Sequence, residues 1–282
     1  MMLPRLVAPL LGLLCPCLQA EDIARDLRGS GTGPNHSDGG YFELSMGAAY
    51  VVDPFLAERD DCDSHNICPS LFASGAYRYR GAFIELADAT YDGLNLGFSL
   101  WDSEHWAVDL LAVNLFGEPS NDDRTSDDPE RQKDLQLIQR SRVFIGTGTR
   151  ITGYFANTIL QLRWVGDVSG EHGAAASMRV GQSWQYRNWN FHAVFSADWL
   201  SNKAANYWIG VSPQEATRRF PAYEAEGSVY RSGEVGVTYP ISAHWVGRTY
   251  LRYSALPDKV ARSPLMDENH ALVLAATVSY AF

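Results

Sequence analysis

Apolar residues alternate with polar or small residues at period two through most of this sequence, in segments separated by turns. In residues 189–199, tryptophan, phenylalanine and alanine take every second position, and residues 270–282 repeat the pattern with leucine, alanine, valine and tyrosine. Successive side chains of a β-strand point to opposite faces, so this pattern predicts strands that each have one apolar face. Twelve segments fit it: 41–51, 70–79, 82–90, 93–101, 105–116, 141–151, 156–166, 174–186, 189–200, 228–239, 244–254 and 270–282.

The connections between these segments fall into two classes. Those after odd-numbered segments are mostly long and polar, at 52–69, 117–140, 167–173, 201–227 and 255–269, with a tight Asp92-Gly93 exception. Those after even-numbered segments are short, at 80–81, 102–104, 152–155, 187–188 and 240–243. Tight turns at one end and long loops at the other are the layout of an outer-membrane barrel. The sequence therefore predicts an all-β fold over 41–282, a closed antiparallel transmembrane β-barrel of about twelve strands.

Membrane physics supports this interpretation. Spanning strands need about 9–11 residues and a closed sheet, because no backbone group can stay unpaired in lipid. Past residue 20 no apolar run approaches the roughly 20 residues that a spanning helix needs. A soluble twelve-strand sandwich is the alternative that no local pattern excludes. Aromatic residues near the predicted strand ends fit the girdles of a membrane barrel: Trp106, Trp164, Trp184, Tyr186, Trp189, Trp199, Tyr239 and Trp245.

The first forty residues have no strand pattern. Residues 1–20 contain Arg5 as their single charge, followed by an apolar stretch, which is typical of a secretory signal peptide. Cleavage is expected between Ala20 and Glu21. Residues 21–40 are polar and rich in glycine, so we expect a flexible periplasmic lead before the barrel.

Four cysteines are present, and two of them belong to the predicted signal peptide. Lipid attachment at Cys15 or Cys17 is disfavoured, because a leucine or a proline precedes each where lipidation requires a small residue. Cys62 and Cys68 enclose five residues, and in an exported chain such a pair predicts a disulfide that closes a loop. Zinc bound through both cysteines and His65 is the alternative, although structural zinc sites use tighter spacing and a second ligand pair.

Composition excludes several classes of function. The chain has 23 Lys and Arg against 33 Asp and Glu, so it lacks the basic surface that nucleic acid requires. The acidic residues near 60–63 and 122–130 do not follow the spacing of a calcium loop. We therefore predict no nucleic-acid partner, no metal and no cofactor.

The predicted inward face carries both polar residues and charges. His192, Ser196 and Asp198 share one strand face, but neighbours two apart lie about 7 Å from each other, so we predict no catalytic residues. Charges of mixed sign inside a narrow barrel pair with each other and plug it, or remain hydrated and form a pore with some anion preference. The predicted lumen charges are Glu43, Glu85, Arg142, Arg150, Arg163, Arg179, Asp198, Glu234, Arg248 and Arg252.

The sequence ends on an aromatic residue that closes a run of alternating apolar residues. This pattern resembles the terminal strand signal that the outer-membrane barrel assembly machinery recognises. The residues of the predicted assembly signal are Leu274, Ala276, Val278, Tyr280 and Phe282.

The last third contains motifs that resemble the MltA-interacting protein family (MipA/OmpV) of Gram-negative outer membranes. The motif residues are Tyr207, Gly210, Val211, Ser212, Pro213, Glu215, Ala216, Pro221, Ala222, Tyr223, Tyr239, Pro240, Ile241, Ser242, Ala243, His244, Trp245, Ser263, Pro264 and Leu265. The resemblance implies a non-enzymatic scaffold in the outer membrane. It implies as partners the membrane lipid, a murein lytic transglycosylase and a bifunctional murein synthase. The alternatives are a small-solute diffusion channel and an adhesin that acts through outer loops such as 117–140.

Overall fold

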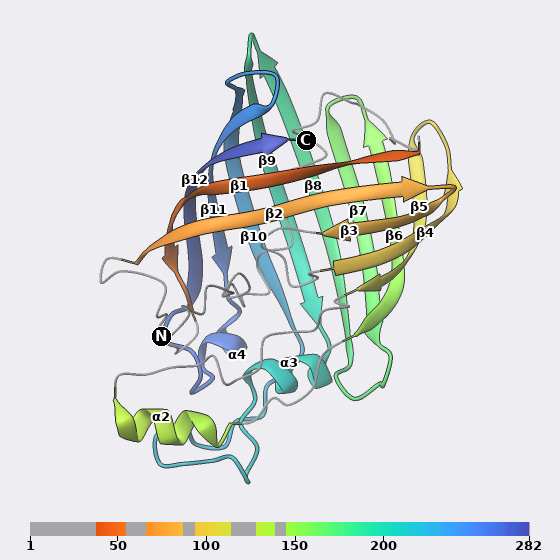
Figure 1. The fold of residues 1–282 in the computed structure, drawn as a ribbon. Helices are drawn as coiled ribbons and strands as arrows, with labels where there is room; N and C mark the ends of the chain where they lie inside the picture. Colours follow the sequence, from red (N-terminus) through yellow and green to blue (C-terminus); the bar gives the residue numbers. More distant parts are fainter. Residues whose placement is uncertain (1–37, 55–65, 87–93, 114–127, 139–144, 282) are drawn as a thin grey trace, which may run out of the picture.

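A computed structural model describes residues 38–54, 66–86, 94–113, 128–138 and 145–281 of the chain. Within these residues, twelve strands form one closed antiparallel barrel, in which sequence neighbours pair and β1 pairs with β12 (Figure 1). The predicted fold class is therefore confirmed. The strands are β1 (Gly39–Val52), β2 (Ile67–Tyr79), β3 (Ala82–Leu86), β4 (Leu94–Asp102), β5 (Trp106–Val113), β6 (Gly146–Phe155), β7 (Thr158–Asp167), β8 (Ala174–Tyr186), β9 (Trp189–Leu200), β10 (Ser228–Pro240), β11 (Trp245–Ala255) and β12 (His270–Ala281).

The connections at the two ends of the barrel differ, as Figure 1 shows. One end has short turns, such as Arg80-Gly81, where both residues have positive φ and a two-residue hairpin results. The other end has the long connections, which contain the helices α2 (Pro129–Gln136), α3 (Asn202–Ile209) and α4 (Asp258–Ala261). None of the helices in the described part of the chain is long and apolar enough to cross a membrane.

Side chains alternate between the two faces of the barrel wall. In β9, Phe191, Phe195 and Trp199 are exposed on the outside, whereas His192 and Ser196 are buried within. β12 follows the same rule, with Leu274 and Val278 outside and Thr277 and Ser279 inside. Apolar residues face outward and polar residues line the interior, which is the arrangement of a barrel that lipid surrounds.

The predicted turn at 152–155 is wrong. β6 continues to Phe155, and the turn consists of Ala156 and Asn157. Gly153 pairs with Trp106 of β5, whose ring lies so close that a Cβ at position 153 would meet it at 2.9 Å. The ring of Trp106 also packs edge-on against Phe155 at 5.3 Å. The glycine therefore makes room for an aromatic neighbour within the sheet and does not mark a turn.

The predicted signal peptide and most of the predicted lead lie outside the described residues, as do Phe282 and the acidic segment 122–127. The first described strand begins at Gly39, two residues before the predicted start.

Candidate functional site

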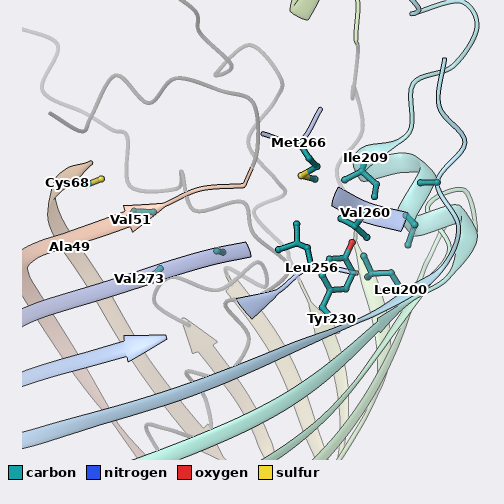
Figure 2. Close-up of a cluster of buried hydrophobic side chains, with 14 of the residues drawn as sticks. Ala49, Val51, Cys68, Leu200, Ile209, Tyr230, Leu256, Val260, Met266 and Val273 are labelled. Carbon is teal, nitrogen blue, oxygen red and sulfur yellow. The ribbon is translucent and has the colours of Figure 1, made fainter. Parts of the chain in front are cut away.

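The long-loop end of the barrel contains an apolar cluster, which we call the cap. It consists of α3, α4 and the rest of the connections 201–227 and 256–269, packed against inward-facing residues of the strands. Ile209 of α3 and Val260 of α4 are 0% exposed. Figure 2 shows these two side chains converging with Leu200, Leu256 and Tyr230. Burial of this much apolar surface holds the connections over the mouth of the barrel.

Hydrogen bonds fix the connections of the cap to one another. The Asn206 side chain donates to the Ala225 carbonyl at 2.6 Å and accepts from the Ala225 amide at 2.7 Å. The Ser263 hydroxyl donates to the carbonyl of Ile209 at 2.6 Å, which ties α3 to the segment after α4. These side chains satisfy buried backbone groups that no helix or sheet pairs.

Helix α2 lies on the outer side of the cap. Its Leu135 and the following Ile138 pack against Val211, Phe220 and Leu265 in a second apolar cluster. Two ion pairs border this contact, Arg219 with Asp128 at 2.8 Å and Arg131 with Asp267 at 3.6 Å. The cap is therefore two layers deep at this point.

Acidification is expected to loosen α2. The hydrogen bond from Arg219 lowers the pKa of Asp128 below its ordinary value of 3.8, helped by the Glu130 amide at the start of the helix. A carboxylate with a lowered pKa stabilises the fold above its unfolded pKa, and this contribution is lost as pH falls through the folded pKa. Hydrogen exchange of 129–136 should rise modestly as the pH falls from about 4 through the lowered pKa of Asp128, after correction for intrinsic rates. Asp128→Asn should remove this rise, and equal pH dependence in both proteins would contradict it.

Three charged or polar groups meet inside the barrel between β9, β10 and β11. Glu234 accepts from Arg252 Nε at 2.8 Å, and its other carboxylate oxygen lies 2.9 Å from His192 Nε2. All three side chains are 1% exposed. Gly236 allows this arrangement, because a Cβ there would lie 2.4 Å from the His192 ring.

A second group lies on the opposite part of the wall. Arg150 of β6 donates through both terminal nitrogens to Glu85 of β3 at 2.9 and 3.0 Å, and through Nε to Asp109 of β5 at 3.0 Å. Such a two-point contact fixes the guanidinium in position. The pair joins strands that are not neighbours in the sheet, so it reaches across part of the lumen.

A third group spans the seam where the barrel closes. Arg248 of β11 donates to Glu43 of β1 and to Ser279 of β12, the latter at 2.6 Å. The hydroxyl oxygens of Ser279 and Ser45 lie 2.8 Å apart. The two ends of the sheet are thus joined by side chains as well as by the backbone ladder.

The distance argument about Ser196 and Asp198 is wrong. Ser196 donates directly to Asp198 at 2.8 Å, because both side chains lean along the strand. Ser196 also contacts Ser232 at 2.6 Å, and Arg179 and Arg163 act electrostatically on Asp198. The His192 ring instead meets Glu234, so these residues do not form a histidine–serine–acid relay. Nine of the ten predicted lumen charges lie among these interior groups, and Arg142 lies outside the described residues.

The two parts of the family motif lie at opposite ends of the barrel. In the cap, Tyr207 packs edge-on against buried His172 at 4.2 Å. Val211 pairs with Tyr223, whose hydroxyl donates to the backbone carbonyl of Lys259. Gly210 ends α3, and Ser212, Pro213 and Pro221 follow in the same connection. Tyr239, Pro240, His244 and Trp245 border the β10–β11 turn, where Trp245 packs against Tyr280 at 5.1 Å.

Sequence reasoning missed the helices of the cap. Ser201 caps α3 by accepting from the Ala204 amide at 3.3 Å, and it precedes a run of residues that favour helix. That signal was present in a connection interpreted only as a long loop.

The assembly and disulfide residues are partly described. Leu274, Ala276 and Val278 face outward from β12, and Tyr280 contacts the β10–β11 turn. Cys68 is disulfide-bonded and buried, but Cys62 lies outside the described residues, so its pairing stays a prediction.

The disulfide can be tested directly. If Cys62 pairs with Cys68, the unreduced mature protein should resist maleimide labelling after denaturation and should change its gel mobility on reduction. Cys68→Ser is the control, because it should expose one thiol without reduction. Full labelling of unreduced protein would contradict the pairing.

Comparison with known proteins decides the family. The family model for the MltA-interacting protein MipA matches residues 44–282, which include every described strand in whole or in part. The chain belongs to the MipA family.

The relatives of this MipA-family barrel are named as outer-membrane proteins. It is 34% identical to outer membrane protein OmpV of Vibrio cholerae over 27% of this chain and 30% of that protein. It is 25% identical to the putative outer membrane protein YiaT of Escherichia coli K12 over 42% of this chain and 45% of that protein. The matched part is thus under half the length of these relatives.

Among solved structures, the outer membrane channel DcaP of Acinetobacter baumannii matches with a TM-score of 0.41 and 9% identity, covering 86% of this chain and 96% of that chain. Family, fold and the names of the relatives place this chain in the outer membrane as a β-barrel.

Proposed function

We propose that this barrel is a non-enzymatic scaffold, which binds a murein lytic transglycosylase on its periplasmic side and holds it near a murein synthase. The description of the family as MltA-interacting supports the first partner. The second partner rests on the resemblance to members of the family.

The cap is the observation that favours a scaffold over a pore as the function of this barrel. Its apolar residues from α3 and α4 pack against inward-facing residues of the strands at the long-loop end, with Ile209 and Val260 fully buried. Inside the barrel, Arg150 and Arg252 form ion pairs with the carboxylates of Glu85 and Glu234. Apolar burial at this end and paired charges in the interior support a barrel that presents its turns for binding over one that conducts solute.

The short turns are the proposed partner surface, together with the lead 21–40. Short turns face the periplasm in barrels of this type, and murein enzymes act on that side. The turns at 80–81, 156–157 and 187–188 are mostly exposed, and Arg80 and Arg187 add positive charge to this end.

Site-specific crosslinking in native outer membranes tests the proposal. A photoreactive residue at Asn188, in the β8–β9 turn, should recover a lytic transglycosylase selectively, with synthase in the same complex. The same residue at Arg218, which is exposed at the long-loop end, is the matched control. An unrelated barrel gives the background.

The outcomes are distinct. Enrichment from position 188 and none from position 218 is the expected result. Recovery no greater than that of the unrelated barrel, or recovery from position 218 alone, would overturn the proposed orientation and partner.

The arginine-rich lining favours a second candidate, a small-solute channel with anion preference. Arg163 and Arg179 are buried in the barrel interior, where positive charge attracts anions if water enters. Conductance of the refolded barrel distinguishes a channel from a scaffold, because a scaffold need not conduct.

A further inference from the structure

The lipid-facing surface of the barrel carries one exceptional residue. Leaving aside the terminal residue of each strand, the outward positions of the described strands are apolar, small or uncharged except for Arg231. Its neighbours Tyr230 and Ser232 are buried, so the exposed Arg231 side chain points away from the interior. No ion pair to Arg231 is found among the described residues.

Arg231 lies near the long-loop end, as the fourth residue of β10. Within its row of the sheet it lies between Ala197 of β9 and Ala255 of β11. These two small side chains leave the flanks of the guanidinium uncovered.

The next outward row has open space at its centre. Gly233 lies there between Phe195 and Tyr253, and a Cβ at position 233 would have no atom within 4 Å. Phe195 and Tyr253 are each 49% exposed and form the walls. Tyr253 is held by stacking on His270 at 5.6 Å. We call Arg231, Gly233, Ala197, Ala255, Phe195 and Tyr253 the Arg231 groove.

A cation on the lipid face is unfavourable at the bilayer centre, and the cost falls towards the interface, where a long side chain reaches the headgroups. A phosphate is the best partner for it there, because guanidinium matches two phosphate oxygens at once. A lipid that bears a phosphate also brings acyl chains, which can pack in the open space over Gly233 between Phe195 and Tyr253.

We propose that the Arg231 groove binds a lipopolysaccharide molecule, with a lipid A phosphate on Arg231 and an acyl chain over Gly233. Long loops face outward in these barrels, so the groove lies in the outer leaflet, where lipopolysaccharide is the phosphorylated lipid. The site is independent of the scaffold role, since it lies on the wall and not at the turns.

Native mass spectrometry of the whole mature barrel in a mild detergent tests the site. Bisphosphorylated lipid A, its dephosphorylated form and phosphatidylglycerol are the three probes. We expect one bisphosphorylated lipid A per barrel and about tenfold weaker binding in Arg231→Gln. Binding by Arg231→Lys should be intermediate, because lysine keeps the charge but loses the two-point contact. Gly233→Leu should weaken binding although Arg231 is unchanged, because the leucine side chain occupies the space proposed for the acyl chain.

Arg187→Asn is the matched control, since Arg187 is an exposed cation at the opposite end whose positive φ asparagine tolerates. Heat-dependent gel mobility shows that each variant is folded. Equal retention of bisphosphorylated lipid A by folded Arg231→Gln would overturn the site. Equal binding of dephosphorylated lipid A or of phosphatidylglycerol would overturn the assignment to lipopolysaccharide.

Discussion

Glu234→Ala should lower the free energy of unfolding by about 3–5 kcal/mol, a larger loss than we expect from any other single substitution in the barrel. The carboxylate of Glu234 contacts both Arg252 and His192, and all three side chains are 1% exposed. Its removal leaves a buried guanidinium without its principal partner, and desolvation of that charge is no longer offset. Urea unfolding in lipid vesicles, followed by tryptophan fluorescence, measures the change.

Glu224→Ala is the matched control, because Glu224 is exposed in the cap and the same chemical change there should cost under about 0.5 kcal/mol. Glu234→Gln should fall between the two, since the amide retains hydrogen bonding but not charge. Equal stability of the Glu234→Ala and Glu224→Ala proteins would show that the interior is hydrated and that the ion pair contributes little.

We expect the intact barrel not to conduct and removal of the cap to make it conduct. Leu200 and Ser228 are paired in the sheet, so a short glycine-rich hairpin can replace 202–226, and a second can replace 257–268. The apolar seal from α3 and α4 is then absent, and water reaches the arginine-lined interior. Conductance in planar bilayers should rise at least about tenfold over the intact protein.

Replacement of residues 103–105 by a glycine-rich turn is the control, because the β4–β5 turn lies at the opposite end of the barrel from the cap and should leave conductance unchanged. High conductance of the intact protein would favour the channel over the scaffold. If the variant without the cap does not conduct, the interior ion pairs alone are sufficient to block the lumen.

Most of the strands were predictable because they obey a local rule, although β4 has a bulge between Ser99 and Trp101 and the predicted end of β6 was wrong. β9 and β12 alternate without interruption, so their faces follow from the sequence alone. The pairing of Glu85 with Arg150 did not follow, because it joins strands separated by two others and depends on the curvature of the closed wall. Gly153 was wrongly assigned to a turn for a similar reason. The glycine is required because the ring of Trp106, on the neighbouring strand β5, occupies the space of a side chain at that position.

The cap was missed because its stability comes from contacts between connections that are distant in sequence. Nothing in the sequence distinguishes Asn206 from other polar residues, because its two hydrogen bonds are to the backbone of Ala225, 19 positions away. The family motif was recognised from residues such as Tyr207 and Tyr223, but their contacts within the cap, with His172 and Lys259, became visible only in the fold.

The seam has a consequence for biogenesis. Ser45 and Ser279 are in contact although they are 234 positions apart. The edge of β1 that pairs with β12 therefore has no partner until β12, the last strand, has been exported. Contacts of such separation form late, and an open strand edge attracts other chains meanwhile. A newly exported chain must therefore be shielded along the free edge of β1 during most of barrel assembly. The ion pair between Glu43 and Arg248 can form only when the barrel closes, and after closure this shielding is no longer needed.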